Sequence, residues 1–224
     1  MDRYYSEKLS ANRLRLCYEV APSRVKRYLE AEIAFVLDKM KPASLVLELG
    51  CGYGRVLQKL AAKARMAVGI DTSYPSLQLA RETIGRDPSC SLYEMDAVAL
   101  GFRDRQFDMV ICVQNGISAF HVNPQRLIQE AMRVTRPGGT ALFSSYAERF
   151  WEDRLEWFRT QSACGLLDEI DEKATGNGVI VCKDGFRAIT FSAGDFTSLA
   201  LKLGIVPQIT EVDGSSLFCE ITVQ

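Results

Sequence analysis

The chain has 224 residues, enough for one domain with a full hydrophobic core, and its 47% hydrophobic and 25% charged residues are typical of globular proteins. A net charge of −1 offers no broad attraction for a phosphate backbone, so a nucleic-acid partner is not expected. The polar, acid-containing N-terminus and the lack of an 18-residue apolar run predict neither a targeting peptide nor a membrane span.

The first forty residues predict two helices. Helical patterns cover residues 6–17 and 22–40, and the break falls near Pro22, because proline interrupts the hydrogen bonding of a helix. The second helix has an apolar face formed by Val25, Tyr28, Leu29, Ile33, Val36 and Leu37. A helix with one apolar face is expected to pack that face on the rest of the protein.

The segment 45–61 predicts a nucleotide-binding loop. An apolar run at 45–49 indicates a buried strand, and a helical pattern begins at Arg55. Between them lie Gly50, Gly52 and Gly54. Glycines let the backbone approach a ligand closely, and the free N–H groups at the helix start face it. A dinucleotide loop would need its last glycine at position 55, and Glu48 would repel a pyrophosphate but suit a cationic ligand. The alternative is a tight turn that binds nothing.

Four more apolar strands follow and alternate with helical patterns. The strands are expected at 66–71, 91–97, 107–113 and 140–144, and the clearest helices at 75–84 and 124–135. This alternation predicts a doubly wound, mostly parallel sheet of the α/β class. Asp71 ends the second strand and Asp96 the third, so both acids are expected at the edge of the sheet where ligands bind. Asp71 is also placed to cap the following helix.

The last 45 residues predict antiparallel structure. A β-hairpin is expected at 179–191, turned by Asp184-Gly185, and a helix at 192–203. Strands at 205–212 and 217–223 are joined around Asp213-Gly214. Two strands joined by a short turn pair antiparallel, so the sheet is expected to end in an antiparallel edge.

The seven cysteines predict neither a disulfide framework nor a metal site. They are scattered, no pair has the C-x-x-C spacing, and none neighbours the single histidine in ligand spacing. A cytoplasmic, reducing location fits this pattern.

The E-x-G-x-G-x-G pattern from Glu48 to Gly54 resembles the first motif of the class I S-adenosylmethionine (AdoMet)-dependent methyltransferases. The stretch 114–121 resembles the corresponding loop of glycine N-methyltransferase-like enzymes, and the resemblance covers about residues 44–146. It implies a seven-stranded, mostly parallel sheet with an antiparallel C-terminal strand. It further implies a helical cap or lid at 1–40 and a Rossmann-like domain at 41–224, with a hairpin insertion at about 178–191.

The resemblance also implies a set of residues that bind AdoMet, or its product S-adenosylhomocysteine (AdoHcy). Asp71 would hold the ribose hydroxyls, Asp96 the adenine amino group, and the N–H of Ala97 the adenine ring. The full set is Glu48, Gly50, Gly52, Gly54, Asp71, Thr72, Asp96, Ala97, Val113 and Asn115.

The expected acceptor site lies beyond the fourth strand. His121 could serve there as a general base, or only as a hydrogen-bonding loop residue. Tyr5 and Tyr18 are expected in the lid, and Tyr146 in the wall of the acceptor pocket, although aromatic residues at such spacing are more often part of a core.

Together these features predict a methyltransferase that acts on nitrogen, oxygen or sulfur of a small molecule. No [DN]-P-P-[YF] motif follows the fourth strand, which argues against methylation of adenine or glutamine nitrogen. Two alternatives stay open: an NAD-type oxidoreductase, and a non-catalytic protein that binds AdoMet or a partner. The sequence leaves the oligomeric state unknown.

Overall fold

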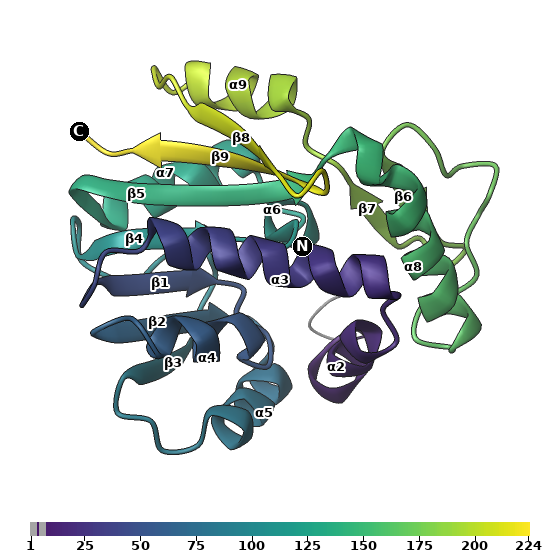
Figure 1. Ribbon diagram of the computed structural model, residues 1–224, viewed down its shortest axis with the longest axis horizontal. Coiled ribbons are helices and arrows are strands. Elements are labelled where there is room, and N and C mark those ends of the chain that lie inside the picture. The colour runs from purple at the N-terminus through teal and green to yellow at the C-terminus, as the bar shows by residue number, and fades with distance from the viewer. Residues whose placement is uncertain (1–3, 5–7) are drawn as a thin grey trace.

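A computed structural model describes residue 4 and residues 8–224, and its centre is a seven-stranded sheet with strand order β3-β2-β1-β4-β5-β9-β8 (Figure 1). The strands are β1 (Leu45–Leu49), β2 (Met66–Asp71), β3 (Cys90–Glu94), β4 (Phe107–Cys112), β5 (Thr135–Tyr146), β8 (Gln208–Val212) and β9 (Ser216–Thr222). Neighbouring strands are parallel except for β9, which is antiparallel to both β5 and β8. The predicted sheet with its antiparallel C-terminal strand is therefore confirmed.

Helices cover both faces of this sheet. The helices are α2 (Ala11–Glu19), α3 (Ser23–Lys39), α4 (Arg55–Ala61), α5 (Tyr74–Ile84), α6 (Gly116–Ala119), α7 (Pro124–Val134), α8 (Trp151–Ala163) and α9 (Ala193–Leu201), with a short 3-10 turn at Glu148–Phe150. Successive residues of β1 point to opposite faces: Val46 joins the core under α3 and α4, and Leu47 joins the core under α7. This burial on both faces explains why β1 is a continuous apolar run.

Short polar segments fix the start of three helices. The side chains of Ser73 and Asn123 accept backbone N–H bonds at the beginning of α5 and α7. Ser192 and Asp195 form a reciprocal capping box at the start of α9. The expected cap of α5 was Asp71; the observed cap is Ser73, and Asp71 accepts a bond from the Ser73 N–H instead.

Two boundaries differ from the sequence expectation. The first helix was expected at 6–17 but α2 begins at Ala11, and residues 5–7 lie outside the described part of the chain. The strand expected at 140–144 begins earlier, at Thr135, and its irregular start lies where the register with β4 shifts between Phe107 and Met109. Gly138 and Gly139 continue the pairing through bonds with Val223, which makes β5 a strand of 12 residues.

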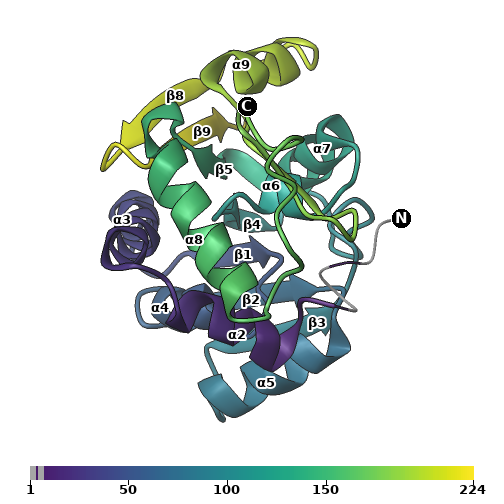
Figure 2. The same cartoon turned by 90° about the vertical axis from the view of Figure 1, so that its right-hand side faces the viewer.

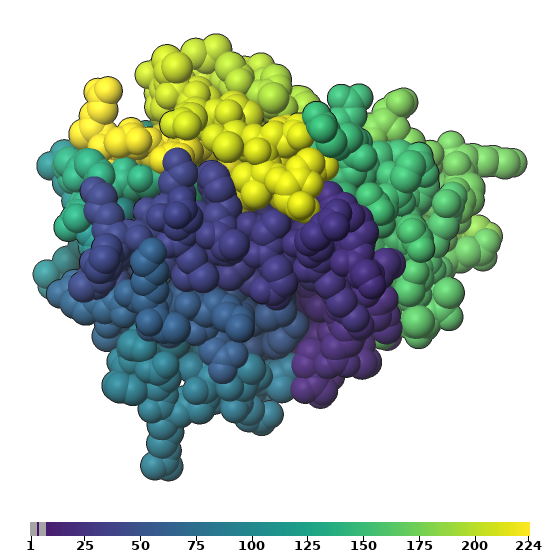
Figure 3. Space-filling model, viewed as in Figure 1, coloured from purple at the N-terminus to yellow at the C-terminus, as the bar shows by residue number. Residues whose placement is uncertain are grey.

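The segment between β5 and α9 forms a unit of its own, with α8 and the hairpin of β6 (Val179–Val181) and β7 (Arg187–Ile189). The hairpin was predicted, and its register pairs Val179 with Ile189; α8 was not predicted. Figure 1 shows α2, α8 and this hairpin grouped at the same end of the sheet, while α3 runs along its face, and Figure 2 looks onto that end. In Figure 3 the purple N-terminal helices and the green segment meet on the surface. None of the described helices is long and apolar enough to cross a membrane.

Candidate functional site

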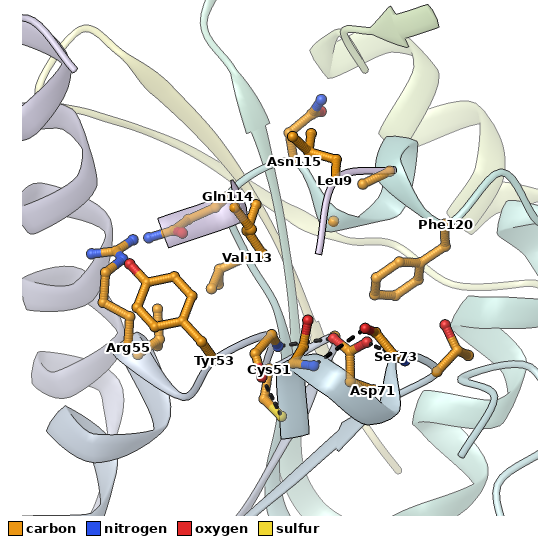
Figure 4. Close-up of a pocket in the computed structure, with 18 of the residues that line it drawn as sticks. Leu9, Cys51, Tyr53, Arg55, Asp71, Ser73, Val113, Gln114, Asn115 and Phe120 are labelled. Atoms are coloured by element: carbon orange, nitrogen blue, oxygen red, sulfur yellow. Dashed lines mark hydrogen bonds between the residues drawn. The ribbon is translucent and has the colours of Figure 1, made fainter. Parts of the chain in front are cut away.

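A cavity of about 620 Å³ lies where β1, β2 and β4 end, beneath α2, α8 and the hairpin (Figure 4). Its wall combines the glycine loop after β1 and the loop after β4 with aromatic side chains from the covering elements. Ligands of open α/β sheets bind at this carboxyl edge, in the crevice where the strand order reverses. Here β1 is that point, because β2 lies on one side of it and β4 on the other.

The glycine loop approaches the cavity with its backbone. Gly50 and Gly52 have φ angles of 74° and 52°, and both line the cavity. A Cβ atom at Gly50 would lie 2.4 Å from the ring of Phe120, so a larger residue there would have to displace that ring. Gly54 differs: it is not among the lining residues, and a Cβ there would lie 2.8 Å from Ile84 of α5. Gly54 therefore packs closely against α5, and its contact with the cofactor stays a prediction.

Asp71 joins the end of β2 to the glycine loop. Its Oδ2 accepts the Gly52 N–H at 2.8 Å and its Oδ1 accepts the Ser73 N–H at 2.8 Å. Burial raises the pKa of the Asp71 carboxyl, and the backbone hydrogen bonds to it act in the opposite direction. Each carboxylate oxygen has a further lone pair, so Asp71 can hold the loop and still accept hydroxyl groups from a ligand.

Glu48 is a buried acid beside the loop. Its side chain is 4% exposed, and its Oε2 has no hydrogen-bond partner in the described part of the chain. Burial raises the Glu48 pKa to about 8, although the charge of Arg55 lowers it. A buried, unpaired carboxyl is costly unless a cation or a donor comes close to it. Glu48 therefore fits a ligand that brings positive charge.

The loops after β3 and β4 complete this end of the cavity. Asp96, Ala97, Thr72 and Val113 all line it, as the sequence predicted for a shared edge. Asp96 is not at the end of a strand, because β3 stops at Glu94; it forms a turn in which its Oδ1 accepts the Val98 N–H at 3.0 Å.

Asn115 lines the cavity, but its side chain binds the protein. Its Nδ2 donates to the Ile189 carbonyl of β7 at 3.0 Å, and its Oδ1 accepts from Ser145 Oγ at 2.7 Å. Figure 4 shows the amide directed away from the glycine loop. The sequence suggested an amide that orients a ligand; in the structure the amide ties the loop after β4 to the hairpin.

The other end of the cavity is aromatic. Tyr18 and Tyr146 line it as expected, together with Tyr28, Trp157 and Phe158. Tyr28 and Tyr146 have ring centroids 5.3 Å apart, and Trp157 donates its indole N–H to the Cys17 carbonyl at 2.8 Å. The predicted contact of Tyr5 lies outside the described residues.

Arg154 of α8 supports this wall from behind. It is fully buried, its guanidinium lies 4.4 Å from the Tyr146 ring centroid, and it donates to the Ala188 carbonyl at 2.9 Å and to Thr190 Oγ1 at 2.6 Å. The sequence gave no sign of this role, because Arg154 stands in a helix with ordinary charged neighbours.

His121 is not among the residues that line the cavity, although Phe120 and Val122 on either side of it are. The chain turns at His121, which has a φ of 49°. A general base must reach the acceptor's proton, directly or through one water, and the role of His121 as that base stays a prediction. No group of three or more potential metal ligands occurs in the part of the chain that the structure describes.

Comparisons with known proteins agree with this geometry. Residues 46–139 match a family model described as a methyltransferase domain. A 2-methyl-6-phytyl-1,4-hydroquinone methyltransferase of Synechocystis sp. is 30% identical over 149 residues, which are 58% of this chain and 46% of that protein. The chain spans about a quarter to a little over half the length of the curated relatives it matches.

Solved structures share the fold. A Pyrococcus horikoshii protein aligns over 100% of both chains with a TM-score of 0.67 and 21% identity. A SAM-dependent methyltransferase from Aquifex aeolicus aligns over 95% of this chain and 99% of its own, with a TM-score of 0.65 and 15% identity.

Proposed function

Because the chain carries a methyltransferase domain on the fold of the class I AdoMet-dependent methyltransferases, we propose that it transfers a methyl group from AdoMet to a small molecule. The observation that carries this proposal is the division of one cavity into two ends. A glycine loop with Asp71 and Glu48 forms one end, and aromatic side chains form the other.

The residues at the first end fit AdoMet. Gly50 and Gly52 present backbone without side chains, and Asp71 has free lone pairs for the ribose hydroxyls. The unpaired Oε2 of Glu48 suits the positive charge that AdoMet carries. A dinucleotide loop would have its last glycine at position 55, which Arg55 occupies, and this argues against the oxidoreductase alternative.

The chain's contribution to the reaction is to position the reactants and exclude water. When bound, AdoMet supplies a methyl group already activated by its sulfonium. Tyr18, Trp157 and Phe158 enclose the acceptor end, so a nucleophile held there would be oriented with little water around it. Burial raises the pKa of Tyr146, so at neutral pH its hydroxyl stays protonated and serves as a hydrogen-bonding group.

The proposed acceptor is a small molecule methylated on nitrogen, oxygen or sulfur. Support comes from the enclosed aromatic end of the cavity and from the net charge of −1, which gives no broad cationic surface for RNA. The name of the Synechocystis relative gives a hydroquinone as that protein's acceptor, so hydroquinones and phenols belong in a first panel with amines and thiols.

Calorimetry with AdoMet, AdoHcy and NADH tests the proposal, followed by an assay of AdoHcy formation with this panel. We expect binding of AdoMet and AdoHcy, no binding of NADH, and turnover with at least one acceptor. Gly52→Val should abolish AdoHcy binding because its side chain fills the loop. Gly204→Val is the matched control, since Gly204 has a similar φ of 73° and open space around it. NADH binding would favour an oxidoreductase, and AdoHcy binding without turnover would favour a non-catalytic protein.

A further inference from the structure

Two buried nitrogen atoms at the wall of the cavity have no hydrogen-bond partner in the described structure: Nη2 of Arg55 and Nε2 of Gln114. Both side chains line the cavity, and Figure 4 shows their ends directed toward each other, one from the start of α4 and the other from the loop after β4. A buried donor without an acceptor is costly, so native proteins rarely leave two of them side by side. A ligand with acceptor atoms would satisfy both.

Arg55 is held in place without an ion pair. Its guanidinium lies 4.6 Å from the ring centroid of Tyr18, and none of the ion pairs in the described part of the chain includes it. The nearby acids neutralise the charge of Arg55 only in part. Burial raises the pKa of Glu32 to about 7 and that of Glu48 to about 8, so neither carboxyl is fully ionised at neutral pH. The cavity wall therefore retains positive charge at Arg55.

The backbone conformation of Gln114 sets the direction of its side chain. Its N–H is shared between Glu32 Oε2 at 2.7 Å and Ser144 Oγ at 2.8 Å, and its φ of 56° lies in the left-handed region that non-glycine residues rarely adopt. Such backbone strain persists only where the surroundings enforce it, and it is common at ligand sites. The side chain thus leaves the end of β4 in a fixed direction, toward the guanidinium.

We propose that Arg55 and Gln114 form a carboxylate-binding subsite inside the cavity. A carboxylate only accepts hydrogen bonds, and its planar pair of oxygens matches the guanidinium and amide donors. This inference rests on the proposed function, which gives the carboxylate two sources: the amino-acid part of AdoMet, or a carboxylate on the methyl acceptor. The unpaired Oε2 of the neighbouring Glu48 would suit the ammonium group of an amino acid.

Calorimetry with two nucleosides separates these cases. AdoHcy carries the amino-acid part, whereas 5′-methylthioadenosine has the same nucleoside and thioether without it. If the carboxylate is that of the cofactor, Arg55→Gln should raise the Kd of AdoHcy roughly 10–100-fold and that of 5′-methylthioadenosine by less than about 2-fold. Gln114→Met should also raise the Kd of AdoHcy, by roughly 3–10-fold, and should leave the Kd of 5′-methylthioadenosine unchanged. Arg86→Gln, at an exposed arginine, is the matched control and should change neither.

If the carboxylate belongs to the acceptor, Arg55→Gln should leave AdoHcy binding unchanged but abolish binding of benzoate to the AdoHcy complex. AdoHcy and benzoate titrations that match those of the parent protein would overturn the subsite. Retained 5′-methylthioadenosine binding shows that the variant is folded, and Arg55→Lys, which keeps the charge, should recover part of the lost affinity. Failure of the parent protein to bind either nucleoside would contradict the proposed function itself.

Discussion

The side-chain amide of Asn115 donates to the carbonyl of Ile189 at 3.0 Å and thereby links the loop after β4 to the hairpin over the cavity. Ser118 and Ser145 add to this link, because Ser118 Oγ accepts the Ile189 N–H and Ser145 Oγ accepts the Phe191 N–H. The hairpin is therefore fastened to the same loop that faces the reacting groups.

Replacement of Asn115 by alanine is expected to loosen this link. The change leaves the buried Ser145 hydroxyl and the Ile189 carbonyl without their partner, so the free energy of unfolding should fall by about 1–3 kcal/mol. Urea unfolding measures the loss, and limited proteolysis should cut the segment 178–191 faster. Gln208→Ala, at an exposed amide, is the control. If the Asn115 variant is as stable as the parent protein, the link makes no contribution to the free energy of unfolding.

Variants of Asp71 test the ribose site. Asp71→Ala should weaken AdoHcy binding by about 1.5–3 kcal/mol, the value of hydrogen bonds to a charged acceptor. Asp71→Asn keeps one acceptor oxygen for the Gly52 N–H, so its stability should be closer to that of the parent while its ribose bonds remain weaker. Calorimetry gives the affinity and thermal unfolding the stability. AdoHcy affinity of Asp71→Ala equal to that of the parent would refute the ribose assignment.

Glu48 predicts how stability depends on pH. Burial raises its folded pKa to about 8, above the value of 4.5 for an exposed glutamate. The unfolded chain therefore releases this proton at lower pH than the folded protein does, and stability falls as pH rises from about 4.5 to about 8. Glu48→Gln should flatten this slope in urea unfolding at pH 5–9. Burial also raises the pKa of Glu32, to about 7, so Glu32 contributes to the same dependence of stability on pH. The Glu48→Gln and Glu32→Gln variants should therefore each remove only part of that dependence.

Binding of a cationic ligand should lower the pKa of Glu48, which burial raises. Positive charge beside the carboxylate favours its ionised form, so AdoMet should bind with release of protons near pH 7. Titrations in two buffers of different ionisation enthalpy measure this release. Glu48→Gln should reduce it, whereas an unchanged value would place the titrating group elsewhere.

His121→Ala should retain the turnover of the parent within about 3-fold between pH 6 and 9, because His121 does not line the cavity. The assay uses an acceptor identified in the panel and should show unchanged AdoHcy affinity. A fall in turnover of roughly 10²–10⁴ would instead restore His121 as a general base.

Periodicity and turn residues were enough to predict most of the fold. The apolar runs of β1, β2 and β4 gave the parallel sheet, and Asp184-Gly185 gave the hairpin. The sequence failed for α8, because the buried side of this helix includes the polar residues Arg154 and Gln161 and so has no clear apolar pattern. It also failed at 136–139, where pairing with Val223 extends β5 through residues that usually form a turn.

The glycine-loop end of the cavity was predictable because its residues lie in short segments next to strands. The spacing of Gly50, Gly52 and Asp71 fixes their positions at the sheet edge. The aromatic end of the cavity depends on tertiary packing instead. Tyr28 of α3 and Gln161 of α8 both line the cavity, although these helices lie far apart in the sequence. No local sequence pattern marks either residue. Arg55 was noted only as a residue that a dinucleotide loop would not have.

The segment from Ala147 to Ser192 leaves the sheet after β5 and returns before α9, so both of its ends are anchored on one side of the cavity. Within it, Arg154 joins α8 to the hairpin, and outside it the contacts with Asn115, Ser118 and Ser145 hold it down. Under the proposed function, Trp157 and Phe158 of this stretch form part of the acceptor end, together with Tyr18, Tyr28 and Tyr146 from outside it. Exchanging this one stretch between related enzymes should therefore change the preference for an acceptor and leave the donor site as it was.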